Sequence, residues 1–288
     1  MEAQLPGPII IPEDFEVYAV ADVHGVLSGL TDVLEQAGLI DAARHWVAPS
    51  RTALVVVGDS IDRGTRSLAV LRLLSALRAE APSAGSAVAI LDGNHEQMAR
   101  DGLDGRTQFL NMWLDFGGPA TLAEMGLAQD SRARRRDVRV LRTAIDRLAP
   151  DFRPFLRSLA PYARWHDVCF VHGGWPFGLR SLGDFEASIE RLWCRSEFYD
   201  GPSLDGPTYR VFREAGLRQA VIGHTPIGPA LFQGGRVLVL DSNCAASQDM
   251  ETEPFMTLAH LSCARGSSLA QAELISVSTA DAPDISPE

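Results

Sequence analysis

The chain has 288 residues, a formal net charge of −11 and a pI of about 5.1, so it can bury a sizeable core, and bulk electrostatics argue against a nucleic-acid partner. Its four cysteines form no CxxC pair and fit reduced core residues of a cytoplasmic protein. The N-terminal residues lack a basic region and no apolar run approaches membrane length, so we expect neither export nor a membrane contact.

The first predicted strand is Phe15–Ala21, which ends in Asp22-Val23-His24-Gly25. A carboxylate and an imidazole two residues apart point to the same side of an extended backbone, so Asp22 and His24 can bind one cation. Helical spacing of apolar residues follows from Ser28 onward. Taken alone, this pattern favours an ordinary capping aspartate beside a surface histidine.

A second unit begins at Leu54–Gly64, LVVVGDSIDRG, whose valine run predicts a buried strand. The run stops at a glycine followed by Asp59 and Asp62. Ligands of α/β folds bind at the carboxyl ends of strands, so a rigid sheet edge should hold both carboxylates. A strongly periodic helix is predicted over Ser67–Glu80.

The third unit repeats the arrangement. The strand predicted over Ala87–Asp92 is followed by Gly93, Asn94, His95 and Glu96. One polar strand ending is common by chance, but three in successive βα units are not. The repetition predicts a metal site.

Residues 97–165 lack strand patterns, and we interpret them as a helical insert beside the site. Two short helices are predicted around Gly117-Gly118 within Trp113–Gly126. The arginine-rich segment 130–142 allows a docking patch for acidic partners, but a solvated helix face is the favoured interpretation.

Two later strands each end in one histidine. Asp167–Val171 leads into His172, and Ala220–Ile222 leads into His224. Between them, Arg195 can either pair with Glu197 at the surface or bind a phosphate, and the residues alone leave both interpretations open.

The closing strands are predicted at Val237–Asp241, Phe255–Leu261 and Glu273–Val277, where they should contribute a second sheet. We therefore expect one catalytic domain over residues 1–276. The polar, proline-containing residues 277–288 are expected to form a disordered tail.

The candidate metal ligands are two carboxylates, three imidazoles and one amide: Asp22, His24, Asp59, Asn94, His172 and His224. This set exceeds what one tetrahedral zinc needs, and suits two ions that share a bridging carboxylate. Two ions roughly 3.5–4 Å apart stabilise both the attacking and the leaving oxygen in a displacement at phosphorus. The pattern therefore indicates phosphoester hydrolysis.

The ordered motifs are similar to those of the calcineurin-like metallophosphoesterase superfamily and, within it, to the bacterial and phage branch of the phosphoprotein phosphatases. They are Asp22–Gly25, Gly58–Gly64, Gly93–Glu96, His172–Gly174 and Gly223–Thr225. Trp113, Gly117-Gly118, Thr121-Leu122 and Gly126 extend the likeness into the insert. The resemblance implies a sandwich of two β-sheets flanked by helices, an αββα arrangement.

The resemblance also implies which residues hold each ion. Asp22 and His24 would bind the first ion, Asp59 would bridge, and the second would be bound by Asn94, His172 and His224. The ligands are oxygen and nitrogen with no thiolate, which fits Mn²⁺, Fe or Zn²⁺, and of these we expect Mn²⁺.

The remaining roles implied by the resemblance concern the phosphate. His95 would be the general acid that protonates the leaving oxygen, oriented by Asp62, while Arg63 and Arg195 would bind the phosphate oxygens. A metal-bridging hydroxide would attack phosphorus directly.

The predicted activity is therefore hydrolysis of phosphomonoesters, foremost phosphoserine and phosphothreonine in proteins. The main alternative is a diadenosine tetraphosphate hydrolase with the same metal centre, which Asp62 and Thr65 disfavour. A non-catalytic scaffold is disfavoured by the presence of His95. The physiological substrate, the preference between phosphoserine or phosphothreonine and phosphotyrosine, the native metal and the oligomeric state stay open.

Overall fold

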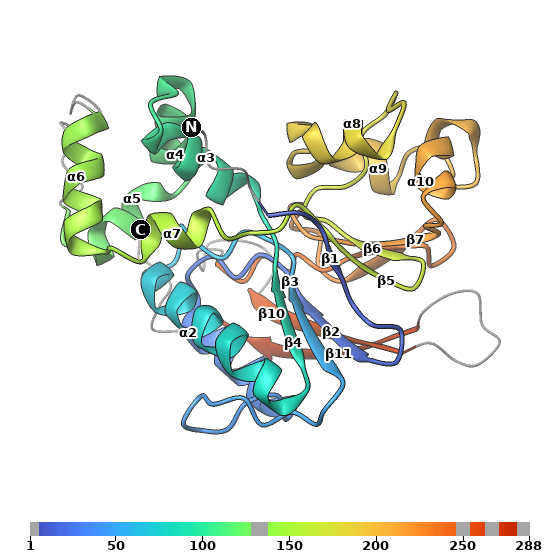
Figure 1. The fold of residues 1–288 in the computed structure, drawn as a ribbon, viewed down its shortest axis with the longest axis horizontal. Coiled ribbons are helices and arrows are strands. Elements are labelled where there is room, and N and C mark those ends of the chain that lie inside the picture. The colour runs from blue at the N-terminus through green and yellow to red at the C-terminus, as the bar shows by residue number, and fades with distance from the viewer. Residues whose placement is uncertain (1–5, 128–137, 246–253, 263–270, 281–288) are drawn as a thin grey trace.

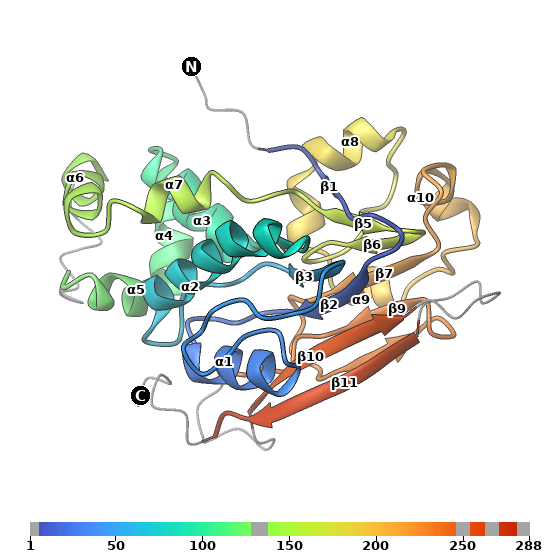
Figure 2. The same cartoon turned by 60° about the horizontal axis from the view of Figure 1, so that its bottom comes forward.

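A computed structural model describes residues 6–127, 138–245, 254–262 and 271–280. Two β-sheets pack face to face, and helices cover their outer faces (Figures 1 and 2). The predicted α/β double-sheet sandwich is confirmed. Over the described ranges, no helix combines the length and the apolar character that crossing a membrane requires.

The first sheet has the strand order β11-β10-β2-β3-β4, with β2, β3 and β4 parallel and β10 and β11 antiparallel. Helices α1 and α2 connect its parallel strands. The bounds are β2 Glu16–Val20, α1 Leu27–Gln36, β3 Thr52–Val56, α2 Ser67–Glu80, β4 Ala87–Ile90, β10 Phe255–Ser262 and β11 Gln271–Ser278.

Strand β3 is buried on both faces, which explains its run of apolar residues. Leu54 and Val56 join the core beneath α1 and α2. Ala53 and Val55 join the core between the two sheets. This central strand therefore ends at a rigidly packed position, which is where the predicted Gly-Asp motif begins.

The second sheet has the strand order β1-β5-β6-β7-β9-β8, with β6, β7 and β9 parallel. Its outer face packs beneath α8, α9 and α10. The bounds are β1 Ile9–Ile10, β5 Ala163–Trp165, β6 Val168–Phe170, α8 Leu182–Ala187, α9 Ser196–Tyr199, α10 Arg210–Glu214, β7 Gln219–Ile222, β8 Ala230–Phe232 and β9 Val237–Val239. Single 3₁₀ turns lie at Ala81–Ala84, Ile189–Leu192 and Pro207–Tyr209.

The closing strands were predicted to form part of a second sheet, and only one of them does. Strand β9 joins the second sheet, whereas β10 pairs with β2 of the first sheet through Ala259 and Ala19, and β11 follows it at the edge. The second sheet is instead completed by β1, β5 and β8. The expected tail also begins too early, because β11 includes Ser278 and the next residue, Thr279, is buried.

The insert is helical, but not over its whole predicted range. Its helices gather at one end of the molecule (Figures 1 and 2), and α3 begins directly after the turn that follows β4. Residues 163–165, placed in the insert from the sequence, form β5 of the second sheet. Of the arginine-rich segment, residues 130–137 lie outside the described residues. The insert helices are α3 Asn94–Leu103, α4 Thr107–Asp115, α5 Gly118–Glu124, α6 Val138–Leu148 and α7 Phe152–Leu156.

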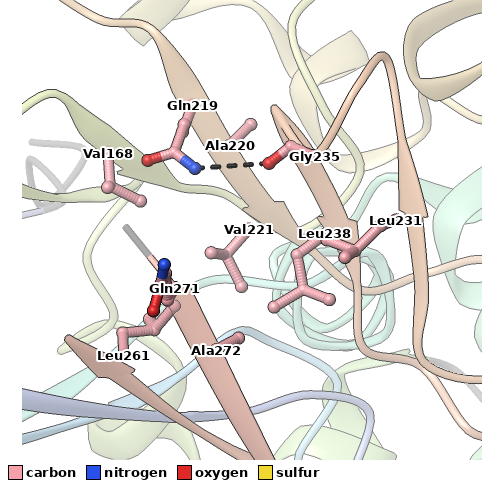
Figure 3. Close-up of a pocket in the computed structure, with 10 residues that line it drawn as sticks. All are labelled: Val168, Gln219, Ala220, Val221, Leu231, Gly235, Leu238, Leu261, Gln271 and Ala272. Carbon is pink, nitrogen blue, oxygen red and sulfur yellow. Dashed lines mark hydrogen bonds between the residues drawn. The ribbon is translucent and has the colours of Figure 1, made fainter. Parts of the chain in front are cut away.

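A cavity of about 500 Å³ lies between the two sheets at the amino ends of β6 and β7 (Figure 3). Its walls are mostly apolar, with Val221 and Leu238 from the second sheet and Leu261 from the first. Gln219 also lines it and donates a hydrogen bond to the carbonyl of Gly235 at 3.3 Å. The sandwich is thus incompletely filled at this edge.

Candidate metal centre and active site

The structure brings all six predicted metal ligands to one edge of the sandwich. Each follows the carboxyl end of a parallel strand, and each side chain lies in a residue that is no more than 5% exposed: Asp22 and His24 after β2, Asp59 after β3, Asn94 after β4, His172 after β6 and His224 after β7. Strands from both sheets therefore converge on the site.

Asp59 lies at the centre of this cluster. Its Oδ2 is 3.6 Å from His24 Nε2, 3.9 Å from His95 Nε2 and 3.4 Å from His172 Nε2. Two groups of possible ligand atoms share it: Asp59 with His24 and His95, and Asp59 with His172 and His224. Asp59 is therefore the one carboxylate among these groups that is placed to bridge two ions.

The backbone at four of the six candidate ligands is in the left-handed region, which is uncommon for residues other than glycine. The φ angles are 53° at Asp22, 45° at His24, 48° at Asp59 and 67° at His224. Such conformations cost on the order of 1–3 kcal/mol each and persist where the surrounding structure enforces them. Their concentration at one edge indicates a site shaped for binding.

Backbone carbonyls orient two of the imidazoles. The Nδ1–H of His24 donates to Ile61 O at 3.0 Å, and that of His172 donates to Val57 O at 2.9 Å, so each Nε2 faces the centre. His172 Nε2 also lies 2.9 Å from Asn94 Oδ1. Within the described residues, the buried Nε2 atoms of His24 and His224 have no hydrogen-bond partner. Buried nitrogens aimed at a shared carboxylate fit metal ligands.

Opposing effects set the pKa values in the cluster. Burial raises the pKa of Asp22 well above its ordinary value, and also acts on Asp59, but His172 and His95 outweigh it there and hold the pKa of Asp59 well below its ordinary value. Burial disfavours a charged His172, yet Asp59 and Asp22 prevail and raise its pKa to about 10. Burial, followed by the charge of His172, lowers the pKa of His224 to about 2. A bound cation would therefore replace a proton on His172.

His95 is held differently from the other histidines. Its Nδ1–H donates to Asp62 Oδ2 at 2.8 Å, and both side chains are buried. Its Nε2 faces Asp59, so distance alone also admits His95 as a ligand. The carboxylate behind the ring is the arrangement that orients a general acid or base.

The two predicted phosphate-binding arginines lie at the exposed rim. The guanidinium of Arg195 donates to His224 O at 3.0 Å, whereas Glu197 accepts only from its backbone N–H at 2.9 Å. The guanidinium is thus directed to the site rather than paired with Glu197. Arg63 has φ of 65°, and its charge is close enough to contribute to lowering the pKa of His24.

Two buried carboxyl residues were given no role from the sequence. Glu96 accepts hydrogen bonds from the backbone N–H groups of Asp59, Ser60 and Gly93, and so ties the loop after β3 to the start of α3. Asp241 follows β9, is buried, and interacts with Asp22. The signal that marked Asp22 and Asp59 as candidate ligands, an acid after an apolar strand, is also present at Asp241.

Comparison with known proteins gives matches over most of the chain. The calcineurin-like phosphoesterase family matches residues 15–247. The Shewanella-like protein phosphatase 2 of Arabidopsis thaliana is 40% identical over 84 residues, which are 29% of this chain and 21% of that protein. The serine/threonine-protein phosphatase 2 of Escherichia coli is 37% identical over 102 residues, which are 35% of this chain and 38% of that protein.

A relative with a different printed activity also matches. The symmetrical bis(5'-nucleosyl)-tetraphosphatase of Janthinobacterium is 42% identical over 79 residues, 27% of this chain and 23% of that protein. All three matches therefore span well under half of the relatives' own length. A solved protein serine/threonine phosphatase from Saccharomyces cerevisiae has a TM-score of 0.59 at 19% identity, covering 94% of this chain and 84% of that one, which supports the fold.

Proposed function

The chain belongs to the calcineurin-like phosphoesterase family, and from this premise we propose that it hydrolyses phosphomonoesters, foremost phosphoserine and phosphothreonine in proteins. The observation that carries the proposal is the position of Asp59, shared by two groups of buried imidazole ligands. A shared carboxylate is what a pair of ions requires, and paired ions serve displacement at phosphorus.

We propose that the six candidate ligands form two ion sites in the positions described above. Asp22 and His24 would hold one ion, Asn94, His172 and His224 would hold the other, and Asp59 would serve both. When bound, the two ions would supply a nucleophilic water at neutral pH and offset the charge of the phosphate. We propose Mn²⁺ as the occupant, because the ligand set contains oxygen and nitrogen only. The nearby thiol of Cys244 instead donates to Asp22 O at 2.9 Å.

The residues of the chain have separate tasks in the proposed reaction. As the phosphorus–oxygen bond to the leaving group breaks, the Nε2 proton of His95 passes to the leaving oxygen. Asp62 holds the ring through Nδ1–H, which keeps Nε2 directed to the site. Arg63 and Arg195, exposed at the rim, bind the phosphate oxygens with planar guanidinium donors.

The proposed general acid, His95, favours a protein substrate over a dinucleotide. The alkoxide of serine or threonine is a poor leaving group, so its departure depends strongly on a proton. A phosphate leaving group needs that proton less. The match to a bis(5'-nucleosyl)-tetraphosphatase makes hydrolysis of dinucleoside polyphosphates the second candidate.

The two candidates can be compared with one purified preparation reconstituted with Mn²⁺. We expect phosphate release from a phosphothreonine peptide with a higher kcat/KM than cleavage of diadenosine tetraphosphate, and loss of both activities with a chelator. A preference for the dinucleotide would overturn the proposed substrate class while keeping the ion sites. Absence of either activity would overturn the proposed reaction.

A further inference from the structure

Some residues of the insert resemble those of the bacterial phosphatases but have no role in the reaction proposed above. They are Trp113, Gly117-Gly118 and Thr121. In the structure, two of these residues contact Asp62, which lies 51 and 59 residues away in the chain. Trp113, Thr121 and Asp62 are all completely buried. The insert thus extends to the carboxylate behind the proposed acid.

Both oxygens of Asp62 are fully engaged. Oδ1 accepts from the hydroxyl of Thr121 at 2.6 Å, and Oδ2 accepts from His95 Nδ1–H at 2.8 Å. The indole Nε1–H of Trp113 is shared by the two oxygens at 3.0 Å each. Three donors therefore fix the plane of the carboxylate, and His95 is only one of them.

The glycine pair brings α4 and α5 close enough for these contacts. Gly117 has φ of 115° and its carbonyl accepts from Arg63 N–H at 3.3 Å. A Cβ on Gly118 would lie 2.6 Å from Trp113 O and 2.7 Å from its Nε1. Larger residues at this turn would push the indole away from Asp62. Gly118 is therefore explained by the contact between Trp113 and Asp62, whereas Gly117 lies against Arg63.

We propose that Trp113 and Thr121 are positioning residues for the reaction, which act by holding Asp62 and through it His95. The inference rests on the proposed acid role of His95. It assigns the α4–α5 hairpin to the catalytic apparatus rather than to substrate recognition alone. A donor lost from Asp62 frees its carboxylate to rotate, and small displacements of a catalytic group reduce turnover strongly.

The test removes each donor to Asp62 by a conservative substitution. Thr121→Val deletes the hydroxyl, Thr121→Ser restores it, and Trp113→Phe keeps a ring that can stack on Phe152. Kinetics compare a phosphothreonine peptide with p-nitrophenyl phosphate, whose leaving group needs little protonation. We expect Thr121→Val and Trp113→Phe to lower kcat for the peptide roughly tenfold more than for p-nitrophenyl phosphate, a fraction of what a general acid contributes. Thr121→Ser, which keeps a hydroxyl, should show the wild-type ratio of the two activities.

Two matched controls make the same substitutions elsewhere. Trp46→Phe alters a buried tryptophan whose indole N–H has no partner among the described residues. Thr31→Val alters a buried helical threonine whose hydroxyl donates to Ser28 O at 2.9 Å. Both controls should leave the ratio of the two activities unchanged.

A double-mutant cycle with Asp62→Asn separates positioning from general destabilisation. If Thr121 acts through Asp62, Thr121→Val should change the activity ratio by less than about twofold in the Asp62→Asn background, whereas independent effects multiply. Multiplying effects, or an unchanged ratio in both single variants, would overturn the inference while leaving the proposed acid intact. If Asp62→Asn itself spares the ratio, the proposed acid role of His95 fails and the inference fails with it, while metal-dependent phosphate release would still support the proposed function. A wild type without metal-dependent hydrolysis would overturn the proposed function itself.

Discussion

The two ends of the parallel strands carry opposite kinds of residue. At their carboxyl ends, β3, β6 and β7 lead into Asp59, His172 and His224, which are buried polar groups close to one another. At the amino ends of β6 and β7, Val168 and Gln219 line a mostly apolar cavity of about 500 Å³. The same strands thus support chemistry at one edge and leave a packing defect at the other. Changes at the first edge should affect activity, and changes at the second should affect stability.

Asp59→Asn should have the largest effect. The amide preserves the shape but not the charge shared by both ion sites, so we expect the loss of activity to exceed the roughly 10²–10⁴-fold that a general acid contributes. Metal per chain, measured by elemental analysis after dialysis against Mn²⁺, should fall in parallel.

The matched control for Asp59→Asn is Leu238→Ala at the opposite edge, which should keep the full metal content. Asp59→Asn with two ions bound and normal turnover would contradict the bridging role.

His95→Asn should separate catalysis from ion binding at the same edge. Because His95 is proposed as the acid and not as a ligand, metal content should persist while turnover of a phosphothreonine peptide falls roughly 10²–10⁴-fold. The loss on p-nitrophenyl phosphate should be much smaller. Equal losses on both substrates would contradict the acid role, and a loss of one ion would make His95 a ligand, as the 3.9 Å distance to Asp59 permits.

Leu238→Ala should produce the reverse pattern. Leu238 is 5% exposed and lines the cavity, so its truncation enlarges a space that is already incompletely filled. We expect the free energy of unfolding in urea to fall by about 2–3 kcal/mol, the lower part of the range for buried leucines. Turnover per folded molecule should be unchanged.

Leu231→Ala, which alters a 64% exposed side chain at the same cavity, is the control and should cost much less. A change in kcat with Leu238→Ala would show that the two edges are coupled.

The carboxyl edge was predictable from sequence because its signals are local. A buried apolar run, a glycine and a polar ligand lie within a few residues at β2, β3 and β4, and parallel strands bring such endings together. The six candidate ligands therefore lie together at this edge. Asp241 has the same local signal after β9 and was treated only as part of a closing strand.

The misassigned regions depend on contacts between distant residues. Phe255–Ser262 reads as a strand in any sheet, and only its pairing with β2, such as Leu258 with Val20, places it in the first sheet. Strand β5 has three residues, too few for a periodic pattern. The link from Thr121 to Asp62 spans 59 residues and could not be read from spacing.

Asp151→Asn should have the smallest effect, and it extends the comparison from buried to exposed carboxylates. Arg72 of α2 donates to Asp151 at 2.7 and 3.3 Å, a separation similar to that of His95 and Asp62, but the two side chains are 53% and 39% exposed. The hydrogen bond from Arg72 holds the pKa of Asp151 below its ordinary value. Solvent screening limits such a pair to at most about 1 kcal/mol.

The sign of its pH dependence follows from the lowered pKa. Asp151 stabilises the folded state above the unfolded-state pKa of a carboxyl group, and this contribution disappears as the pH falls through the lower folded-state pKa. Urea unfolding should therefore show Asp151→Asn less stable than wild type near neutrality and equal to it in strong acid. Asp32→Asn, at an exposed position of α1, should match wild type at neutral pH. A cost near pH 7 as large as that of Leu238→Ala would mean that α7 depends on this ion pair for docking on α2, and that exposure alone does not set the strength of a carboxylate contact in this fold.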